Sequence, residues 1–392
     1  MRGSRSGWVG ALVVAMGGLL AACGSAGEPS VTSVQPARTH AHPAPPSGFT
    51  TTTRARPHST PRARPPHGSA PNAGRLLGQM IVARFRGPVP SAAFLARVRE
   101  GQIGGVILFA DNVAAGVEAT RRLAAELQRA ARDGGNPPLL IMVDQEGGEV
   151  KRLPGPPALA PAQMASRRVA FAQGALTGQL LHAAGINVDL APVADVERIA
   201  GSFLGTRSFG STAVGVARRA CAFAQGVASA GVAYTLKHFP GLGRAPGNTD
   251  LANVSIDASS AALRSDYLGY RVCGADPLAL VMVSSAIYPA LAGSLPAVMS
   301  PSIYRRELPL AVPGGSPVTI SDDLESPAIV SQAAPARHAV EAGLDLLLYA
   351  QTERASDYAY SKLLADVRAG LIPVARLVAA NRTIRDLKDR LR

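Results

Sequence analysis

Short apolar runs alternate with Ala- and Leu-rich segments of helical spacing from Arg75 onward. The runs are rich in β-branched side chains and are bounded by Gly, Pro, Asn or Asp, which is typical of buried strands. Regular alternation of this kind predicts repeated strand-helix units. The predicted strands span residues 78–85, 105–109, 139–143, 188–191, 233–236, 278–283, 318–321 and 344–349.

Eight such strands predict an α/β protein with a (β/α)8 barrel of the TIM type. Most of the runs are apolar at nearly every position, as expected for parallel strands that are buried on both faces. Segments 114–132, 213–230 and 335–342 have the spacing of outer helices. An open sheet that binds a dinucleotide would need a glycine-rich turn after the first strand, but Arg84-Phe85-Arg86-Gly87 stands there.

The beginning of the chain has a different pattern. Two arginines precede an apolar stretch over residues 8–20, and the string Leu20-Ala21-Ala22-Cys23 closes it. This arrangement predicts a lipoprotein signal peptide over 1–23, with Cys23 acylated after cleavage. A signal-anchor helix is the alternative, but the apolar stretch is short for a membrane span. We therefore expect an exported protein that is lipid-anchored to the outer face of the cell membrane.

Residues 24–74 are dense in Pro, Thr, Ser, Arg and His and have almost no apolar periodicity. Such a segment cannot bury enough apolar surface to offset its chain entropy, so it is predicted to be an unfolded linker. The remaining residues, 75–392, are then expected to form one catalytic domain.

The net charge of +13 and the isoelectric point near 10.4 raise the possibility of a nucleic-acid partner. No stripe of Lys and Arg interleaved with aromatic residues occurs in the predicted domain, so that class is disfavoured, and attraction to anionic envelope surfaces is favoured instead. Cys221 and Cys273 remain in the mature chain. They are predicted to be two separate buried thiols, with a disulfide as the alternative, because nothing in the sequence sets their distance.

Polar side chains gather where the predicted strands end. An Asp in such a place is often only a helix cap, and a single His is often structural. Carboxylates mixed with cations on one rim nevertheless suit a sugar, because carboxylates accept hydrogen bonds from hydroxyls and cations donate to them. The residues concerned are Asp144-Gln145-Glu146, Arg152, Asp195, Arg207, Lys237-His238 and Ser321-Asp322-Asp323.

Five strings in this order resemble the motifs of the β-N-acetylglucosaminidase branch of glycoside hydrolase family 3: DQEGG, APVADV, GTRSFG, KHFPG and ISDDL. The resemblance runs from about Leu77 to Leu387. It implies a (β/α)8 barrel, no metal or other cofactor, and a retaining mechanism through a covalent glycosyl-enzyme. It also implies that Asp322 is the nucleophile and Asp323 only its neighbour. The implied substrate-binding residues are Asp144, Arg152, Arg207, Lys237 and His238.

The loop after KHFPG departs from that family. The family has a histidine where Leu242 stands, and Asp-Ser-His, which supplies the acid/base, where Asn248-Thr249-Asp250 stands. Three interpretations follow. Asp250 is itself the acid/base, or Asp257 or Glu149 reaches in from a neighbouring segment, or the protein holds a sugar without cleaving it.

Two further charged residues bear on the departure from the family, Glu149 and Arg244. Glu149 stands where the family commonly has Arg, which disfavours an anionic neighbouring sugar, and Arg244 in the variant loop is a candidate to offset it. Taken together, the residues predict an exported glycosidase that removes terminal β-linked N-acetylglucosamine from peptidoglycan fragments. A sugar-binding envelope lipoprotein and a β-glucosidase of the same family are the alternatives, the latter disfavoured because such enzymes usually carry a second domain.

Overall fold

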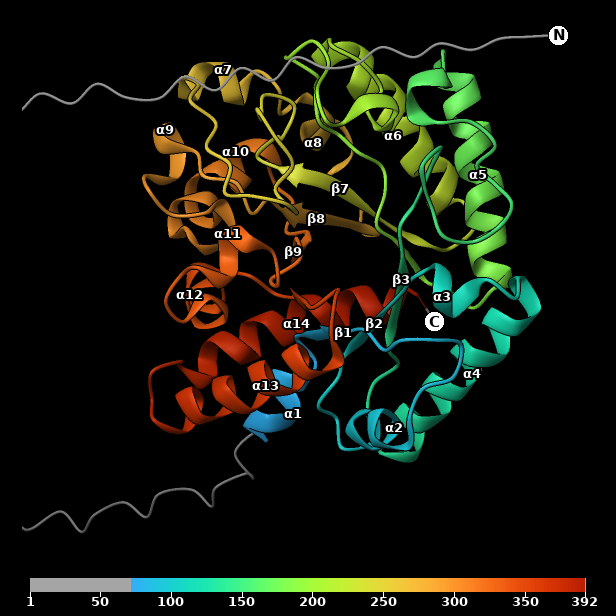
Figure 1. Ribbon diagram of the computed structural model, residues 1–392, viewed down its shortest axis with the longest axis vertical. Coiled ribbons are helices and arrows are strands. Elements are labelled where there is room, and N and C mark those ends of the chain that lie inside the picture. The colour runs from blue at the N-terminus through green and yellow to red at the C-terminus, as the bar shows by residue number, and fades with distance from the viewer. Residues whose placement is uncertain (1–71, 392) are drawn as a thin grey trace, which may run out of the picture. The chain divides into compact units, whose positions relative to one another are not determined.

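Eight parallel strands form the central sheet of residues 72–391, the part of the chain that this computed structural model describes (Figure 1). The hydrogen-bonded order is β10-β1-β2-β3-β6-β7-β8-β9. A bridge between Ile320 and Leu346 joins the two outer strands of that order, so the sheet closes into a barrel and the predicted fold is confirmed. The strands are β1 Ile81–Ala83, β2 Gly105–Leu108, β3 Leu140–Val143, β6 Val188–Asp189, β7 Ala233–Phe239, β8 Ala279–Val283, β9 Val318–Ser321 and β10 Leu347–Leu348, with a small hairpin of β4 Gln145–Gly147 and β5 Val150–Lys151.

Helices surround this sheet. Several begin at a Ser or Thr whose hydroxyl accepts a hydrogen bond from a backbone N–H of the first turn, which satisfies a donor that the helix itself leaves open. Within residues 72–391, none of the helices is both long enough and apolar enough to span a bilayer. They are α1 Ala73–Gly78, α2 Ala92–Arg99, α3 Ala110–Val113, α4 Val117–Asp133, α5 Arg167–Ala183, α6 Ala213–Ala228, α7 Ser260–Arg264, α8 Leu268–Cys273, α9 Pro289–Ala292, α10 Leu308–Ala311, α11 Pro327–Val330, α12 Pro335–Ala342, α13 Glu353–Arg368 and α14 Val374–Arg390.

Strand boundaries differ from the predicted ones in an informative way. The first strand is shorter than residues 78–85, because residues up to Gly78 belong to α1 and only Ile81–Ala83 pair with neighbours. The fifth is longer than predicted, because β7 continues through Lys237 and His238 to Phe239. These two polar side chains therefore belong to a buried strand rather than to the loop after it, which limits their movement. Cys23 and residues 24–71 lie outside the described residues. Residues 72–74, predicted as the end of the linker, instead form the N-cap and the first residues of α1.

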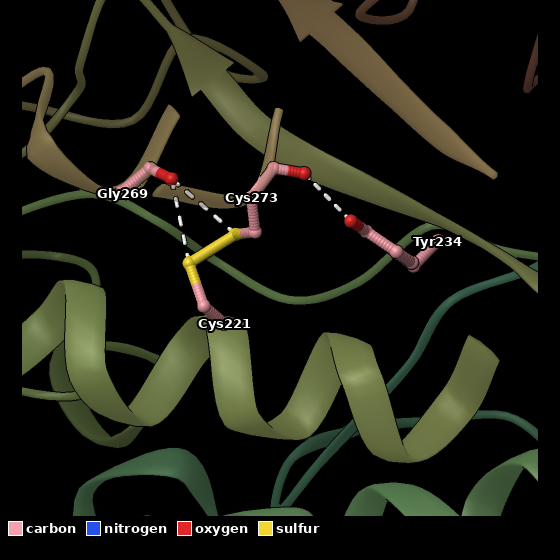
Figure 2. The surroundings of a disulfide bond; sticks show 4 residues. All are labelled: Cys221, Tyr234, Gly269 and Cys273. Atoms are coloured by element: carbon pink, nitrogen blue, oxygen red, sulfur yellow. Dashed lines mark hydrogen bonds between the residues drawn. A yellow bond between two sulfur atoms is a disulfide. The ribbon is translucent and has the colours of Figure 1, made fainter. Parts of the chain in front are cut away.

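Cys221 and Cys273 form a disulfide, so the prediction of two separate thiols is wrong (Figure 2). Cys221 lies on α6 and Cys273 is the last residue of α8, and the packing of these helices brings the two Cα atoms to 5.7 Å, the usual spacing for a disulfide. The backbone oxygen of Cys273 accepts a hydrogen bond of 2.6 Å from the hydroxyl of Tyr234 on β7. The crosslink therefore joins two helices directly and is tied to the strand that carries Lys237 and His238.

Replacing both cysteines by serine is expected to lower the free energy of unfolding by about 4 kcal/mol, because the bond closes a loop of 52 residues in the unfolded chain. Both side chains are buried, and neither lines the cavity described below. The melting temperature should therefore fall, while the activity measured well below it should change little. Denaturant unfolding with and without a reductant measures this. The reductant should shift the wild-type midpoint and leave that of the double variant unchanged. Equal midpoints for the two proteins in the absence of reductant would contradict the expectation.

Candidate active site

A cavity of about 350 Å³ opens at the carboxyl ends of the barrel strands. In a parallel barrel these ends share one face, so residues far apart in the sequence meet there. The implied nucleophile, the first acid/base candidate and all five implied substrate-binding residues line this active-site cavity: Asp322, Asp250, Asp144, Arg152, Arg207, Lys237 and His238.

Lys237 and Arg207 are held by a carboxylate beneath the cavity, that of Glu146 on β4. Oε1 of Glu146 lies 2.7 Å from Nζ of Lys237, and both of its oxygens accept hydrogen bonds of 2.8 Å from the guanidinium of Arg207. Burial alone would raise the pKa of Glu146, but the two cations outweigh it and lower this pKa to about 2. Glu146 is therefore ionised at neutral pH and holds both cations in place.

Asp144 is the carboxylate of this network that faces the cavity. Its Oδ1 accepts a hydrogen bond of 2.7 Å from Nζ of Lys237, and its Oδ2 lies 3.8 Å from Nη2 of Arg152. Arg152 packs over the ring of Phe109, with its guanidinium carbon 5.3 Å from the ring centre. Because the separation from Asp144 exceeds hydrogen-bond length, the guanidinium of Arg152 keeps donors for a ligand.

His238 is oriented by Asp195, which follows β6. Oδ2 of Asp195 lies 2.8 Å from Nδ1 of His238, and the same carboxylate accepts the backbone N–H groups of His238 and Leu242. A carboxylate can only accept hydrogen bonds, so the imidazole proton is assigned to Nδ1 and Nε2 is available to a sugar hydroxyl. The buried side chain of Asp195 thus fixes both the orientation of the His238 ring and the position of the first residues of the loop after β7.

Asp322 follows the last residue of β9 and is half-buried in the cavity wall. The backbone N–H of Asp323 donates to its Oδ1 at 2.9 Å, which orients the carboxylate. The side chain of Asp323 is occupied elsewhere, because it accepts from Nε2 of Gln351 at 2.7 Å and from the backbone N–H groups of Glu325 and Ala350. Burial raises the pKa of Asp323 to about 6. Asp323 thus fixes the loop, whereas the carboxylate of Asp322 is oriented at the wall of the active-site cavity.

Asp250 reaches the cavity from the loop after β7. Its backbone N–H donates to Oδ1 of Asn248 at 3.0 Å, which makes a tight turn and presents the carboxyl group at the mouth. Partial desolvation raises the pKa of Asp250, and the negative charge of Asp322 raises it further, against the opposing effects of His238 and Arg207. Two carboxyl groups in one cavity, one of which has its pKa raised by the other, are arranged as paired carboxyl groups with different roles are.

Among the described residues, no group of three or more His, Cys, Asp or Glu side chains is arranged to hold a metal ion. The groups in the cavity are instead suited to gripping hydroxyls and to paired carboxylate chemistry.

A family model described as the glycosyl hydrolase family 3 N-terminal domain matches residues 75–387. The chain belongs to glycoside hydrolase family 3. It is therefore a glycosidase, as its sequence motifs suggested.

Relatives of this family 3 protein include the beta-hexosaminidase LpqI of Mycobacterium tuberculosis, which is 30% identical over 357 residues, or 85% of this chain and 89% of that protein. An uncharacterized secreted glycosyl hydrolase of Arthroderma benhamiae is 31% identical over 327 residues, or 80% of this chain and 92% of the other. Among solved structures, a family 3 β-N-acetylglucosaminidase from Paenibacillus sp. has a TM-score of 0.77 and 32% identity, over 82% of this chain and 63% of that one.

The other interpretations of the variant loop receive less support from the geometry of this family 3 protein. Asp250, Asp257 and Glu149 are all exposed, but only Asp250 lines the active-site cavity. Arg244 donates to Oδ2 of Asp266 at 3.2 Å and is also absent from the lining, so it does not offset the charge of Glu149 within the cavity. His182 and His338 lie on α5 and α12, away from the cavity lining.

Glu146 and Asp195 were among the polar residues noted near the strand ends, but the sequence assigned no role to either. Both stood in the strings DQEGG and APVADV, but a carboxylate in a motif carries no sign of which way it faces. Glu146 is only 2% exposed and lies beside two cations, and Asp195 is 1% exposed and lies beside an imidazole. These positions follow from how the strands pack and cannot be seen in the sequence. For Glu146 the available signal was an acidic residue three positions after the buried strand β3.

Glu146→Gln is expected to lower kcat/KM about 10- to 100-fold, chiefly through KM, because Lys237 and Arg207 lose the charge that holds them in register. Glu149→Gln is the matched control, since Glu149 lies three residues away but is exposed outside the cavity. Steady-state kinetics measure both. Circular dichroism separates misplaced cations from a failure to fold, and equal kinetics for the two folded variants would argue against the positioning role.

Proposed function

We propose that this family 3 glycosidase is a retaining β-N-acetylglucosaminidase that releases terminal β-linked N-acetylglucosamine, with peptidoglycan fragments as its substrate. The observation that carries the proposal is the shared cavity of Asp322, Asp250 and the cationic grip of Arg207 and Lys237. The names of relatives support the choice of sugar, because a β-N-acetylglucosaminidase and a beta-hexosaminidase are among them.

In the proposed mechanism, the network of Asp144, Arg152, Arg207, Lys237 and His238 holds the hydroxyls of the terminal ring. A carboxylate oxygen of Asp322 attacks the anomeric carbon while the bond from that carbon to the glycosidic oxygen breaks. Asp250 gives its proton to the departing oxygen, and the product is a glycosyl ester of Asp322. Hydrogen bonds that the ring hydroxyls donate to the fixed carboxylate of Asp144 strengthen as the ring gains positive charge, because the hydroxyls become more acidic, and this lowers the barrier.

The second step reverses these roles. Asp250, now ionised, takes a proton from water while the water oxygen attacks the anomeric carbon and the ester bond to Asp322 breaks. The sugar leaves with its original β configuration, Asp322 regains its charge and Asp250 its proton. The electrostatic coupling of the two carboxyl groups supports this exchange: when Asp322 is esterified it no longer carries the charge that raises the pKa of Asp250, so Asp250 ionises more readily as a base.

The proposed location rests on the leader, which lies outside the described residues. A basic start, an apolar stretch and Cys23 support acylation and anchoring to the outer face of the membrane. Cys23→Ala is expected to abolish incorporation of a labelled fatty acid and to move the protein from the membrane to the soluble fraction. Full labelling of the variant would show that the acylated residue is not Cys23.

The proposed activity is tested with 4-nitrophenyl β-N-acetylglucosaminide and the purified full-length protein. Proton NMR of the first-formed sugar should show the β anomer, as expected when the configuration is retained. Hydrolysis of the corresponding β-glucoside at a higher kcat/KM would instead favour the β-glucosidase alternative. Sugar binding without turnover would favour the binding-protein alternative. This alternative is tested because the loop after β7 lacks the acid/base histidine of the family.

A further inference from the structure

A cavity of about 200 Å³ lies at the opposite end of the barrel from the active site. Gln79, just before β1, lines it, and so do residues 135–137, which connect α4 to β3. These segments lead into the amino ends of the strands, whereas the active-site cavity lies at their carboxyl ends. The rest of the wall comes mainly from α1 and α14. This basal cavity takes no part in the proposed mechanism.

Three cations line the basal cavity, and none of the described residues in its wall is a carboxylate. The cations are Arg75 of α1 and Arg385 and Lys388 of α14. Like charges around one space repel one another, and an anion in that space offsets the repulsion. The other polar residues of the wall are amides: Asn72, Gln79, Asn136 and Asn381. The composition of the wall therefore favours a negatively charged ligand.

The two arginines are accessible and have hydrogen-bond donors to spare. Both residues are exposed. Nη1 of Arg75 donates to the backbone oxygen of Gly134 at 3.1 Å and to Oδ1 of Asn136 at 2.8 Å, which fixes the guanidinium and leaves Nε and Nη2 for a ligand. The side chain of Arg385 has no hydrogen bond or ion pair with another described residue. Because a guanidinium matches two oxygens of a phosphate, both arginines suit a phosphate group.

Lys388 supplies a buried charge without a counter-charge. Its Nζ donates to Oε1 of Gln79 at 2.8 Å and to the backbone oxygen of Gly104 at 2.9 Å, and both of these acceptors are uncharged. Lys388 is only 3% exposed, and burial lowers its pKa to about 7 with no carboxylate acting against this effect. An isolated buried charge is costly. An anion in the adjoining basal cavity offsets that cost through its field, without having to touch Nζ.

Asn72, which also lines the basal cavity, is the first residue that the structure describes. Its side chain caps α1 by accepting the backbone N–H groups of Gly74 and Arg75. In the sequence, the segment before Asn72 leads back to Cys23, the proposed site of acylation. The chain therefore enters the barrel beside the basal cavity. A phospholipid surface presents phosphate groups, so a lipid headgroup is one source of such an anion and free phosphate is the other.

We propose that the basal cavity binds a phosphate group through Arg75 and Arg385, with Lys388 as the buried charge behind them. The phosphate is either free or part of a lipid headgroup. The lipid source rests on the proposed acylation of Cys23, and the free source does not.

Inorganic phosphate and sulfate are the probes, added to the full-length protein at low ionic strength. Isothermal titration calorimetry should show one saturable site, and sodium chloride at equal ionic strength should show none. Arg385→Gln should weaken binding about tenfold or more, because a hydrogen bond between charged groups is lost. Arg382→Gln is the matched control and should bind like the wild type, because Arg382 is also an exposed arginine of α14 but lines a different cavity.

Sulfate also reports on Lys388, because sulfate does not itself titrate near neutral pH. Its binding should raise the pKa of Lys388 and take up protons, so the measured heat should depend on the ionisation enthalpy of the buffer. Lys388→Met should abolish this dependence. Circular dichroism establishes first that this variant folds, since it leaves two buried acceptors without a donor. If it does not fold, Arg385→Gln still tests the site.

Sedimentation with vesicles distinguishes the two sources of the phosphate. The full-length protein is mixed with vesicles of phosphatidylcholine alone, or of phosphatidylcholine and phosphatidylglycerol in equal parts. If the ligand is a lipid headgroup, phosphatidylglycerol should increase the sedimented fraction of the wild type more than that of Arg385→Gln. Equal effects on the two proteins, with phosphate binding weakened in the variant, identify free phosphate.

Absence of saturable binding of phosphate and sulfate up to about 10 mM would overturn the site. So would equal affinities of Arg385→Gln and the wild type. None of these measurements requires turnover, so their failure is distinct from failure of the proposed activity. The titration with phosphate is also independent of whether Cys23 is acylated.

Discussion

Asp322→Asn is expected to lower kcat/KM for β-N-acetylglucosaminides by a factor on the order of a thousand or more, because the amide cannot form the glycosyl ester. The fold should survive, since Asp322 is half-buried at the end of β9 and the amide can still accept the hydrogen bond from the N–H of Asp323. Turnover of the nitrophenyl substrate measures the loss. Mass spectrometry of the wild type with a slow fluorinated substrate should find the sugar on the peptide that contains Asp322.

The matched control is Asp257→Asn, which also neutralises an aspartate but at an exposed position outside the cavity. It should retain wild-type kinetics. Asp322→Ala adds a second test, because azide can enter the space left by the carboxylate and attack the anomeric carbon once. The product should be the α-glycosyl azide. Release of a β product by this variant would mean that another carboxylate is the nucleophile.

Asp250→Asn is expected to lower kcat/KM by about 10²- to 10⁴-fold on substrates with poor leaving groups, because no proton reaches the departing oxygen. The loss in the first step should be much smaller with 4-nitrophenolate, a leaving group that departs without a proton. A plot of kcat/KM against leaving-group pKa should therefore be steeper for the variant than for the wild type. Equal slopes would assign proton donation to another residue.

The pH profile gives an independent readout of Asp250. A general acid acts when protonated, so a raised pKa extends activity to higher pH, and kcat/KM falls as pH rises through that value. Asp250→Asn should lose this alkaline limb. Asp322→Asn should lower the pKa of Asp250, because it removes the negative neighbour that helps to raise it, and any residual alkaline limb should move to lower pH.

Much of the site was predictable because its residues sit beside strands. The carboxyl ends of all strands in a parallel barrel lie on the same face, the one that carries active sites. Asp144, Asp322 and the Lys237-His238 pair could therefore be placed together from the sequence alone. Asp250 was less certain from the sequence, because a long loop has many paths. The turn made by Asn248 and the raised pKa beside Asp322 are what distinguish it from Asp257 and Glu149.

The sequence by itself determined the barrel, the order of its strands and the identity of the residues on its rim, because periodicity and strand-end chemistry are local properties of the chain. Only the tertiary structure decided that Cys221 bonds to Cys273 and that Glu146 and Asp195 hold the cation pair and the imidazole. These features depend on distances of a few ångströms between elements distant in the sequence. Such distances are set by how helices and strands pack, and no local pattern records them.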